Sequence, residues 1–117
     1  MIKNMQLNTI EKEIIKCFLS GKGISVEDDF FYNLKVKSRE LSGVGFITDL
    51  EKSEQLKIGE ENETYKFSDL EARINVSIET GYLIYVENGF LDAIEGYTYT
   101  DDWPEEIYKI DIYSTRL

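Results

Sequence analysis

The chain has 117 residues, of which 13 are basic and 23 acidic, for a formal net charge of -10. It has 42% apolar residues, enough to bury a core, and no histidine, which removes Ser-His and Cys-His catalysis and the commonest zinc ligand. The acidity excludes direct binding to nucleic acid or to an anionic membrane surface, because both need clustered Lys and Arg. We therefore expect a single domain over residues 1–117, with no cofactor and no metal.

A helix is predicted over about Thr9 to Leu19. Asn8 can cap it, and Glu11 three residues later completes a pair that resembles a capping box. Apolar residues recur at helical spacing and define one face, formed by Ile10, Ile14, Cys17 and Phe18. The lone cysteine, Cys17, cannot form an intrachain disulfide and is expected to be a buried structural thiol.

A second, short helix is expected from Ser25 to about Asn33, where acidic residues follow a serine and favour a helix N-terminus. An extended linker is the alternative, because one or two turns are marginal without tertiary support. From Leu34 the apolar period changes to two, which predicts strands on either side of a turn at Ser42-Gly43. On the first of these strands, three cations are expected to share a face: Lys35, Lys37 and Arg39.

The polar segment from Glu51 to Glu63 predicts a surface loop. The clearest strand pattern then runs from Leu70 to Ile78, with Thr80-Gly81 expected to turn the chain. Asn88-Gly89 is a strong two-residue hairpin signal between strands predicted at Tyr82 to Glu87 and Phe90 to Tyr99.

If the Asn88-Gly89 turn closes tightly, Glu87 opposes Phe90 and Tyr85 opposes Asp92. One face of the hairpin then carries Ile84, Val86, Leu91 and Ala93, and the other carries Leu83, Tyr85, Phe90 and Ile94. Both faces are partly apolar, so the hairpin is expected to be central in the sheet, or to be covered on one face by another chain. With a last strand at Tyr108 to Ile112, the sequence predicts an α+β fold, in which one or two N-terminal helices pack on an antiparallel sheet of about five to six strands.

The acidic excess is confined to the second half of the chain. Residues 1–58 hold nine basic and nine acidic residues, whereas residues 59–117 hold four basic and fourteen acidic residues. Between Ile74 and Tyr108 there are eight acidic residues, no Lys or Arg, and six Tyr or Trp residues. Carboxylates interleaved with aromatic residues suit recognition of a basic protein, although a solvated acidic face that aids solubility is the simpler interpretation.

The candidate partner-binding residues come from this window. The electrostatic set is Asp92, Glu95, Asp101, Asp102, Glu105 and Glu106, and the aromatic anchors are Tyr97, Tyr99 and Trp103. An acid and base pair of a hydrolase could come from Glu87, Asp92 and Glu95 with Asp101 or Asp102. The four carboxylates around Trp103, Asp101, Asp102, Glu105 and Glu106, could hold a divalent cation. The spacing fits no known cation loop and fixes no separation between two carboxyl groups, so neither interpretation is favoured.

Two segments, Ser38 to Asp49 and Glu95 to Tyr99 followed by Trp103-Pro104, resemble stretches of a family of small uncharacterised bacterial proteins and imply no activity. In size, acidity and predicted architecture the chain also resembles immunity proteins of contact-dependent growth inhibition toxin systems. That resemblance implies a non-enzymatic inhibitor whose partner is a cognate toxin domain, such as a basic nuclease. The single cysteine and the charged N-terminal residues separately favour a cytoplasmic protein. The alternatives are a stand-alone protein-interaction or accessory domain and, least favoured, a carboxylate-based hydrolase.

Overall fold

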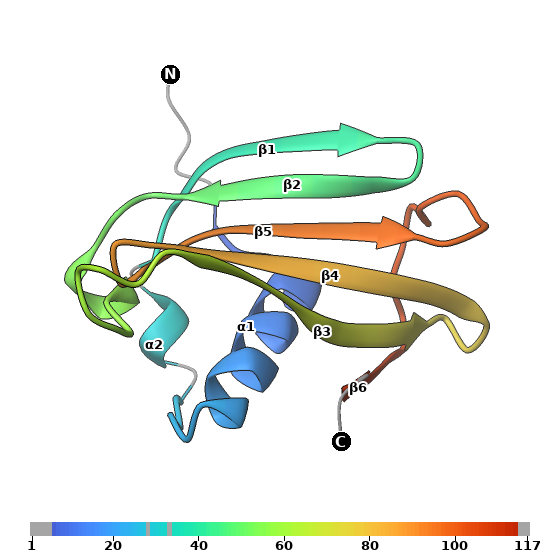
Figure 1. The fold of residues 1–117 in the computed structure, drawn as a ribbon. Helices are drawn as coiled ribbons and strands as arrows, with labels where there is room; N and C mark the ends of the chain where they lie inside the picture. The colour runs from blue at the N-terminus through green and yellow to red at the C-terminus, as the bar shows by residue number, and fades with distance from the viewer. Residues whose placement is uncertain (1–5, 28, 33, 115–117) are drawn as a thin grey trace.

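A computed structural model describes residues 6–27, 29–32 and 34–114 of the chain. Its main feature is an antiparallel sheet of six strands in the order β1-β2-β5-β4-β3-β6. The strands are β1 (Val36–Ser42), β2 (Gly45–Leu50), β3 (Tyr65–Ile74), β4 (Ile78–Glu87), β5 (Phe90–Thr98) and β6 (Ile110–Ser114). Two helices, α1 (Thr9–Gly21) and α2 (Asp29–Tyr32), lie on the same side of this sheet (Figure 1). The predicted α+β arrangement is confirmed.

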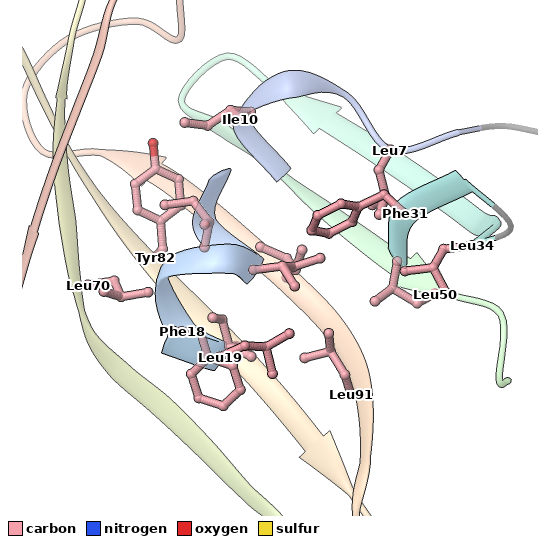
Figure 2. Close-up of a cluster of buried hydrophobic side chains, with 14 of the residues drawn as sticks. Leu7, Ile10, Phe18, Leu19, Phe31, Leu34, Leu50, Leu70, Tyr82 and Leu91 are labelled. Atoms are coloured by element: carbon pink, nitrogen blue, oxygen red, sulfur yellow. The ribbon is translucent and has the colours of Figure 1, made fainter. Parts of the chain in front are cut away.

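Helix α1 begins where the sequence predicts. The Asn8 side chain accepts a hydrogen bond from the Glu11 N–H at 3.0 Å, and the Asn8 N–H donates to Glu11 Oε1 at 2.8 Å, which completes the capping box. Ile10, Phe18 and Leu19 point from the helix toward the strands and form the core with side chains of the sheet (Figure 2). The helix is longer than expected, since it ends at Gly21.

The core continues at the other end of the sheet, where Leu7, Phe31, Leu34 and Leu50 gather (Figure 2). Phe31 is the buried residue of the short helix α2, whereas its neighbour Tyr32 is exposed. The predicted end of this helix, Asn33, lies outside the described residues. The predicted surface loop after β2 also contributes to the core, because the 3-10 helix η1 (Glu54–Leu56) buries Leu56 completely.

The prediction that Lys35, Lys37 and Arg39 share one face of the first strand is wrong. The register of β1 against β2 shifts between Val36 and Ser38, and this irregularity reverses the alternation of the side chains after it. Lys35 and Lys37 are exposed, but Arg39 turns toward α1, where its guanidinium binds the Glu11 carboxylate.

The predicted strand from Leu70 to Ile78 is wrong, as is the turn at Thr80-Gly81. The chain instead turns between β3 and β4, where Ile74 pairs with Ile78, and Thr80-Gly81 lies inside β4. Asn75 and Val76 adopt left-handed backbone conformations, with φ of 49° and 73°. A β-branched residue is unfavourable in that region, so local propensity favoured a continuous strand.

The Asn88-Gly89 hairpin is confirmed, and β4 and β5 are central in the sheet. Glu87 pairs with Phe90 and Val86 with Leu91, as expected, but Tyr85 then pairs with Ala93 because Asp92 is the extra residue of a bulge. A bulge moves every later side chain of β5 to the opposite face. Ile94 is therefore in the core with Ile84, whereas Ala93 lies on the other face with Tyr85.

Candidate functional site

The face of the sheet opposite α1 carries a continuous set of tyrosine and glutamate side chains. Strand alternation and the pairing registers place together Ile47, Glu71, Arg73, Glu79, Leu83, Tyr85, Glu95, Tyr97, Tyr99 and Tyr113. We call this set the open face, because within the described ranges both helices lie on the other side of the sheet (Figure 1). Its side chains are half-buried or exposed, whereas most side chains of the inner face are buried.

Hydrogen bonds across the strands hold the open face in a defined arrangement. Three tyrosine hydroxyls each donate to a glutamate on another strand, in the pairs Tyr85–Glu95 (2.9 Å), Tyr99–Glu71 and Tyr113–Glu79. These pairs connect β4 to β5, the end of β5 to β3, and β6 to β4. Because both partners of each pair are fixed, little side-chain freedom remains to be lost when another surface docks on them.

The same bonds affect the ionisation of the tyrosines. Desolvation and then the hydrogen bond to Glu95 raise the pKa of Tyr85. Desolvation and then the hydrogen bond to Glu71 raise the pKa of Tyr99, and for Tyr113 the hydrogen bond to Glu79 is the largest cause of a raised pKa. All three hydroxyls therefore remain protonated at neutral pH and donate to the glutamate oxygens.

Gly81, in the middle of β4, makes room for two of these rings. A Cβ atom at this position would lie 2.7 Å from the hydroxyl oxygens of both Tyr97 and Tyr99, so the two side chains extend over the glycine backbone. Their rings meet edge to face, with centroids 5.5 Å apart at an interplanar angle of 88°. The glycine thus makes room for the hydroxyl ends of Tyr97 and Tyr99 beside the β4 backbone.

The charge on the open face is mainly negative. Arg73 Nε donates to Glu79 Oε1 at 2.6 Å, and this exposed ion pair lowers the pKa of Glu79, after the larger effect of the Tyr113 hydroxyl. Glu71 and Glu95 have tyrosine partners but no Lys or Arg partner among the described residues. Two carboxylates of this face are thus left without an intramolecular counter-charge.

Three of the nine residues predicted as the binding site lie on the open face, namely Glu95, Tyr97 and Tyr99. Asp92 lies in the β5 bulge, which precedes Glu95 near the start of the strand. Desolvation raises the pKa of Asp92, nearby Glu87 and Asp49 raise it further, and Lys37 lowers it. The bulge therefore brings several acidic groups together at the other end of this strand.

The other five predicted residues lie in the connection from β5 to β6: Asp101, Asp102, Trp103, Glu105 and Glu106. The structure does not place Trp103 on the open face. Its ring packs edge to face on Phe46, a residue of the inner face, with centroids 5.2 Å apart, and the backbone N–H of Trp103 donates to the Gly43 carbonyl at 2.8 Å. Trp103 therefore fixes the connection to the helix side of the sheet, while the four carboxylates around it are exposed.

Asn75 holds the end of the same connection. Its side-chain amide donates to the Glu106 carbonyl at 2.7 Å, and its side-chain oxygen accepts from the Tyr108 N–H at 2.8 Å. The Asn75 N–H also donates to the Lys109 carbonyl at 2.8 Å. One residue of the β3–β4 turn thus positions the acidic connection just before β6.

Seven of the ten residues of the open face were missed as site candidates: Ile47, Glu71, Arg73, Glu79, Leu83, Tyr85 and Tyr113. For Glu71 and Arg73 the signal was present, in their alternation with buried Ala72 and Ile74. The sequence prediction places the turn after Ile78, and with the turn there Arg73 cannot pair with Glu79 as it does in the structure.

The larger hollows have fewer acidic groups. A groove of about 770 Å³ between α1 and residues 107–112 has one carboxylate in its lining, Glu13, and a hollow of about 590 Å³ beside Trp103 also has one, Glu105. Across the described ranges, no cluster of three or more Cys, Asp or Glu side chains is arranged to hold a metal ion. Nor is any helix in this part of the chain long and apolar enough to cross a membrane.

Comparisons of the chain with protein-family profiles, curated proteins and solved structures gave no match.

Proposed function

We propose that this protein is an immunity protein, which binds and neutralises a cognate bacterial toxin domain through the open face. The observation that supports it is the open face itself. It carries four tyrosines, and two of its glutamates, Glu71 and Glu95, have no Lys or Arg partner in the described chain. A basic protein surface supplies the missing counter-charges, and tyrosines provide large contact area at low entropic cost.

The size and rigidity of the face also support a protein partner. The molecule measures 45 × 38 × 24 Å, and its broad side exceeds the roughly 800 Å² that one partner contributes to a typical stable complex. The tyrosine–glutamate bonds fix the side chains before binding, which favours a slow dissociation rate.

A nuclease is the kind of toxin that this surface suits best. A nuclease must present cations to hold phosphate groups, and a negatively charged inhibitor can occupy the same cations. The exposed carboxylates of residues 101–106 extend the negative surface beyond the sheet and are expected to speed association more than they strengthen binding. We place the interaction in the cytoplasm, where the lone Cys17 remains reduced.

A hydrolase is less well supported. The hollows of about 770 Å³ and 590 Å³ each contain one carboxylate, and two carboxylates together line only much smaller hollows, of about 160 Å³ and 80 Å³. Hydrolysis by a carboxylate pair needs both in one cleft that also holds the substrate, and such clefts measure about 300–1,000 Å³. A stand-alone interaction domain would use the same open face with a different partner, and the experiment below separates it from an immunity protein.

The test is to purify the toxin domain encoded next to this gene and to measure its binding to this chain by surface plasmon resonance at low and high salt. We expect nanomolar affinity and an association rate that falls at least tenfold between about 50 mM and about 500 mM NaCl. We also expect that expression of the chain restores growth to cells that produce the toxin. Lack of both binding and protection would refute the immunity function.

Two variants identify the surface used. Combining Glu71→Gln with Glu95→Gln removes two charges from the open face but keeps an acceptor oxygen for each tyrosine. Asp101→Asn combined with Asp102→Asn removes the same number of charges from the β5–β6 connection. We expect the first pair to increase the dissociation rate strongly and the second to lower mainly the association rate. The reverse order would show that the connection, and not the open face, binds the toxin.

A further inference from the structure

A small hollow lies in the open face at one edge of the sheet, where β1, β2 and β5 follow one another. Its volume is about 160 Å³, and the side chains in its lining include Glu40, Val44, Ile47, Glu95 and Tyr97. The pairing registers place Glu40, Ile47 and Glu95 side by side on three neighbouring strands. From two strand spacings, the Cα atoms of the two glutamates are roughly 10 Å apart, with Ile47 between them.

The hollow exists because no side chain can occupy position 45. Gly45 pairs with Tyr97, and a Cβ atom on it would lie 2.0 Å from the carbonyl oxygen of Gly96 on the neighbouring strand. The close approach of the two backbones therefore leaves the space beside the Tyr97 ring unfilled. The hollow is a consequence of how β2 and β5 pair.

Its two carboxylates are available to an external cation. Glu95 is half-buried, and its Oε1 accepts the Tyr85 hydroxyl at 2.9 Å, but no residue of the described chain pairs with it as a cation. Glu40 is exposed and likewise has no Lys or Arg partner in these residue ranges. A half-buried carboxylate at the centre of a partly apolar face gains strongly from an opposite charge that also excludes water.

Apart from Ser42, the other side chains in the lining are apolar or aromatic. Val44, in the β1–β2 turn, is 53% exposed and Ile47, on β2, is 41% exposed, and the Tyr97 ring lines the hollow beside them. Apolar surface suits the methylene stem of a long side chain, and an aromatic ring suits a planar cation stacked on it. An arginine combines both, and its guanidinium can also bind a carboxylate through two parallel hydrogen bonds.

We propose that this hollow receives one arginine side chain of the protein partner. The methylene groups lie on Val44 and Ile47, the guanidinium stacks on Tyr97, and Glu95 accepts its hydrogen bonds, with Glu40 as a second acceptor at the rim. This inference rests on the proposed function for the identity of the partner, because it specifies which side chain the bound protein inserts. The site itself can be tested without that partner.

The test is an NMR titration of the full-length, ¹⁵N-labelled chain with the pentapeptide acetyl-Gly-Val-Arg-Val-Gly-amide. We expect saturable shifts of the amide signals of Ile47, Glu95 and Tyr97, with a dissociation constant on the order of 1 mM for a single inserted side chain. The same peptide with citrulline, which has the shape of arginine without its charge, is expected to bind about tenfold more weakly.

Glu95→Gln is the decisive variant, because glutamine keeps an oxygen for the Tyr85 hydroxyl and removes only the charge. We expect it to abolish the saturable shifts. Glu61→Gln, on an exposed turn outside the lining of this hollow, makes the same change in net charge and is expected to leave the titration unaltered. The dispersion of the NMR spectrum shows in each case that the variant is folded.

Several outcomes would overturn the inference. Absence of saturable shifts, equal binding of the arginine and citrulline peptides, or equal loss in the Glu95 and Glu61 variants would each contradict it. Equal binding of a lysine peptide would contradict recognition of a guanidinium. If the toxin domain binds but the peptide does not, only the arginine site fails; if the peptide binds and no toxin does, only the immunity function fails.

Discussion

The buried ion pair between Glu11 and Arg39 provides the sharpest test of how this fold is held together. Arg39→Met removes the guanidinium but keeps a side chain of similar length. In the native protein, Arg39 Nε donates to Glu11 Oε2 at 2.8 Å and Nη2 donates to Oε1 at 2.6 Å. The pair joins the first turn of α1 to β1, 28 residues further along the chain.

The size of the effect follows from the burial of Glu11. Its side chain has no exposed surface, whereas that of Arg39 is 19% exposed. After the substitution the carboxylate keeps the Asn8 N–H and the Thr48 hydroxyl as donors but loses its counter-charge. Removing one partner of a buried pair costs about 3–5 kcal/mol, and with two donors remaining we expect about 3 kcal/mol. That is a large part of the free energy of unfolding of a typical domain, which is about 5–15 kcal/mol.

The assay is urea unfolding followed by the fluorescence of Trp103 and by circular dichroism. With a denaturant slope of about 2 kcal/mol per molar urea, a loss of 3 kcal/mol lowers the midpoint by about 1.5 M. Arg73→Met is the matched control, because Arg73 binds Glu79 at the same N–O distance of 2.6 Å but with side chains 53% and 37% exposed. We expect that variant to keep the midpoint of the native chain within experimental error.

A double variant separates the worth of the pair from the penalty of leaving one partner alone. Glu11→Leu combined with Arg39→Met replaces both charges by apolar groups and should recover much of the stability lost in Arg39→Met. It should still lack the capping-box contribution of about 1 kcal/mol. Equal midpoints for Arg39→Met and Arg73→Met would refute the reasoning, since burial would then make no difference to an ion pair of the same length.

Three further predictions concern the backbone and the core. Val76→Gly should stabilise the protein by about 1 kcal/mol, measured by urea unfolding, because glycine adopts the observed φ of 73° without strain. Gly45→Ala should destabilise it by more than about 2 kcal/mol through the 2.0 Å approach to the Gly96 carbonyl, while Gly43→Ala, with open space around it, should be neutral in the same measurement. Burial raises the pKa of Tyr82 from 10.0 to about 12, so the unfolded chain releases this proton first and stability falls as pH rises from 10 to 12. That decrease, about 2 kcal/mol by pH 12, should be smaller in Tyr82→Phe when urea midpoints are compared across this range.

Features that depend on a few neighbouring residues were predictable. Asn8 and Glu11 define the start of α1, because a capping box satisfies two N–H groups three residues apart. Asn88 and Gly89 define the β4–β5 hairpin, because both adopt positive φ, at 53° and 83°, as a tight hairpin turn requires. The change from helical to alternating periodicity near Leu34 predicted the order of helices and strands.

Features that depend on contacts between distant segments were not predictable. No local signal marks the turn at Asn75 and Val76, since it is stabilised by hydrogen bonds from Asn75 to residues 106–109. No local sequence signal marks the bulge at Asp92 either, although it decides whether Ala93 or Ile94 enters the core. The larger and more apolar Ile94 is buried against α1, and burial of that additional surface favours the shifted register.

The candidate site likewise has some residues that local sequence predicts and others that only contacts between distant segments bring together. The sequence by itself determined that the second half of the chain is acidic and rich in tyrosine, and it selected Glu95, Tyr97 and Tyr99. Only the tertiary structure brought Glu71, Glu79 and Tyr113 to the same face and turned Trp103 to the other side of the sheet. Charge and aromatic content are sums over residues, whereas a surface depends on strand register, and register is decided by the packing of the whole sheet on α1.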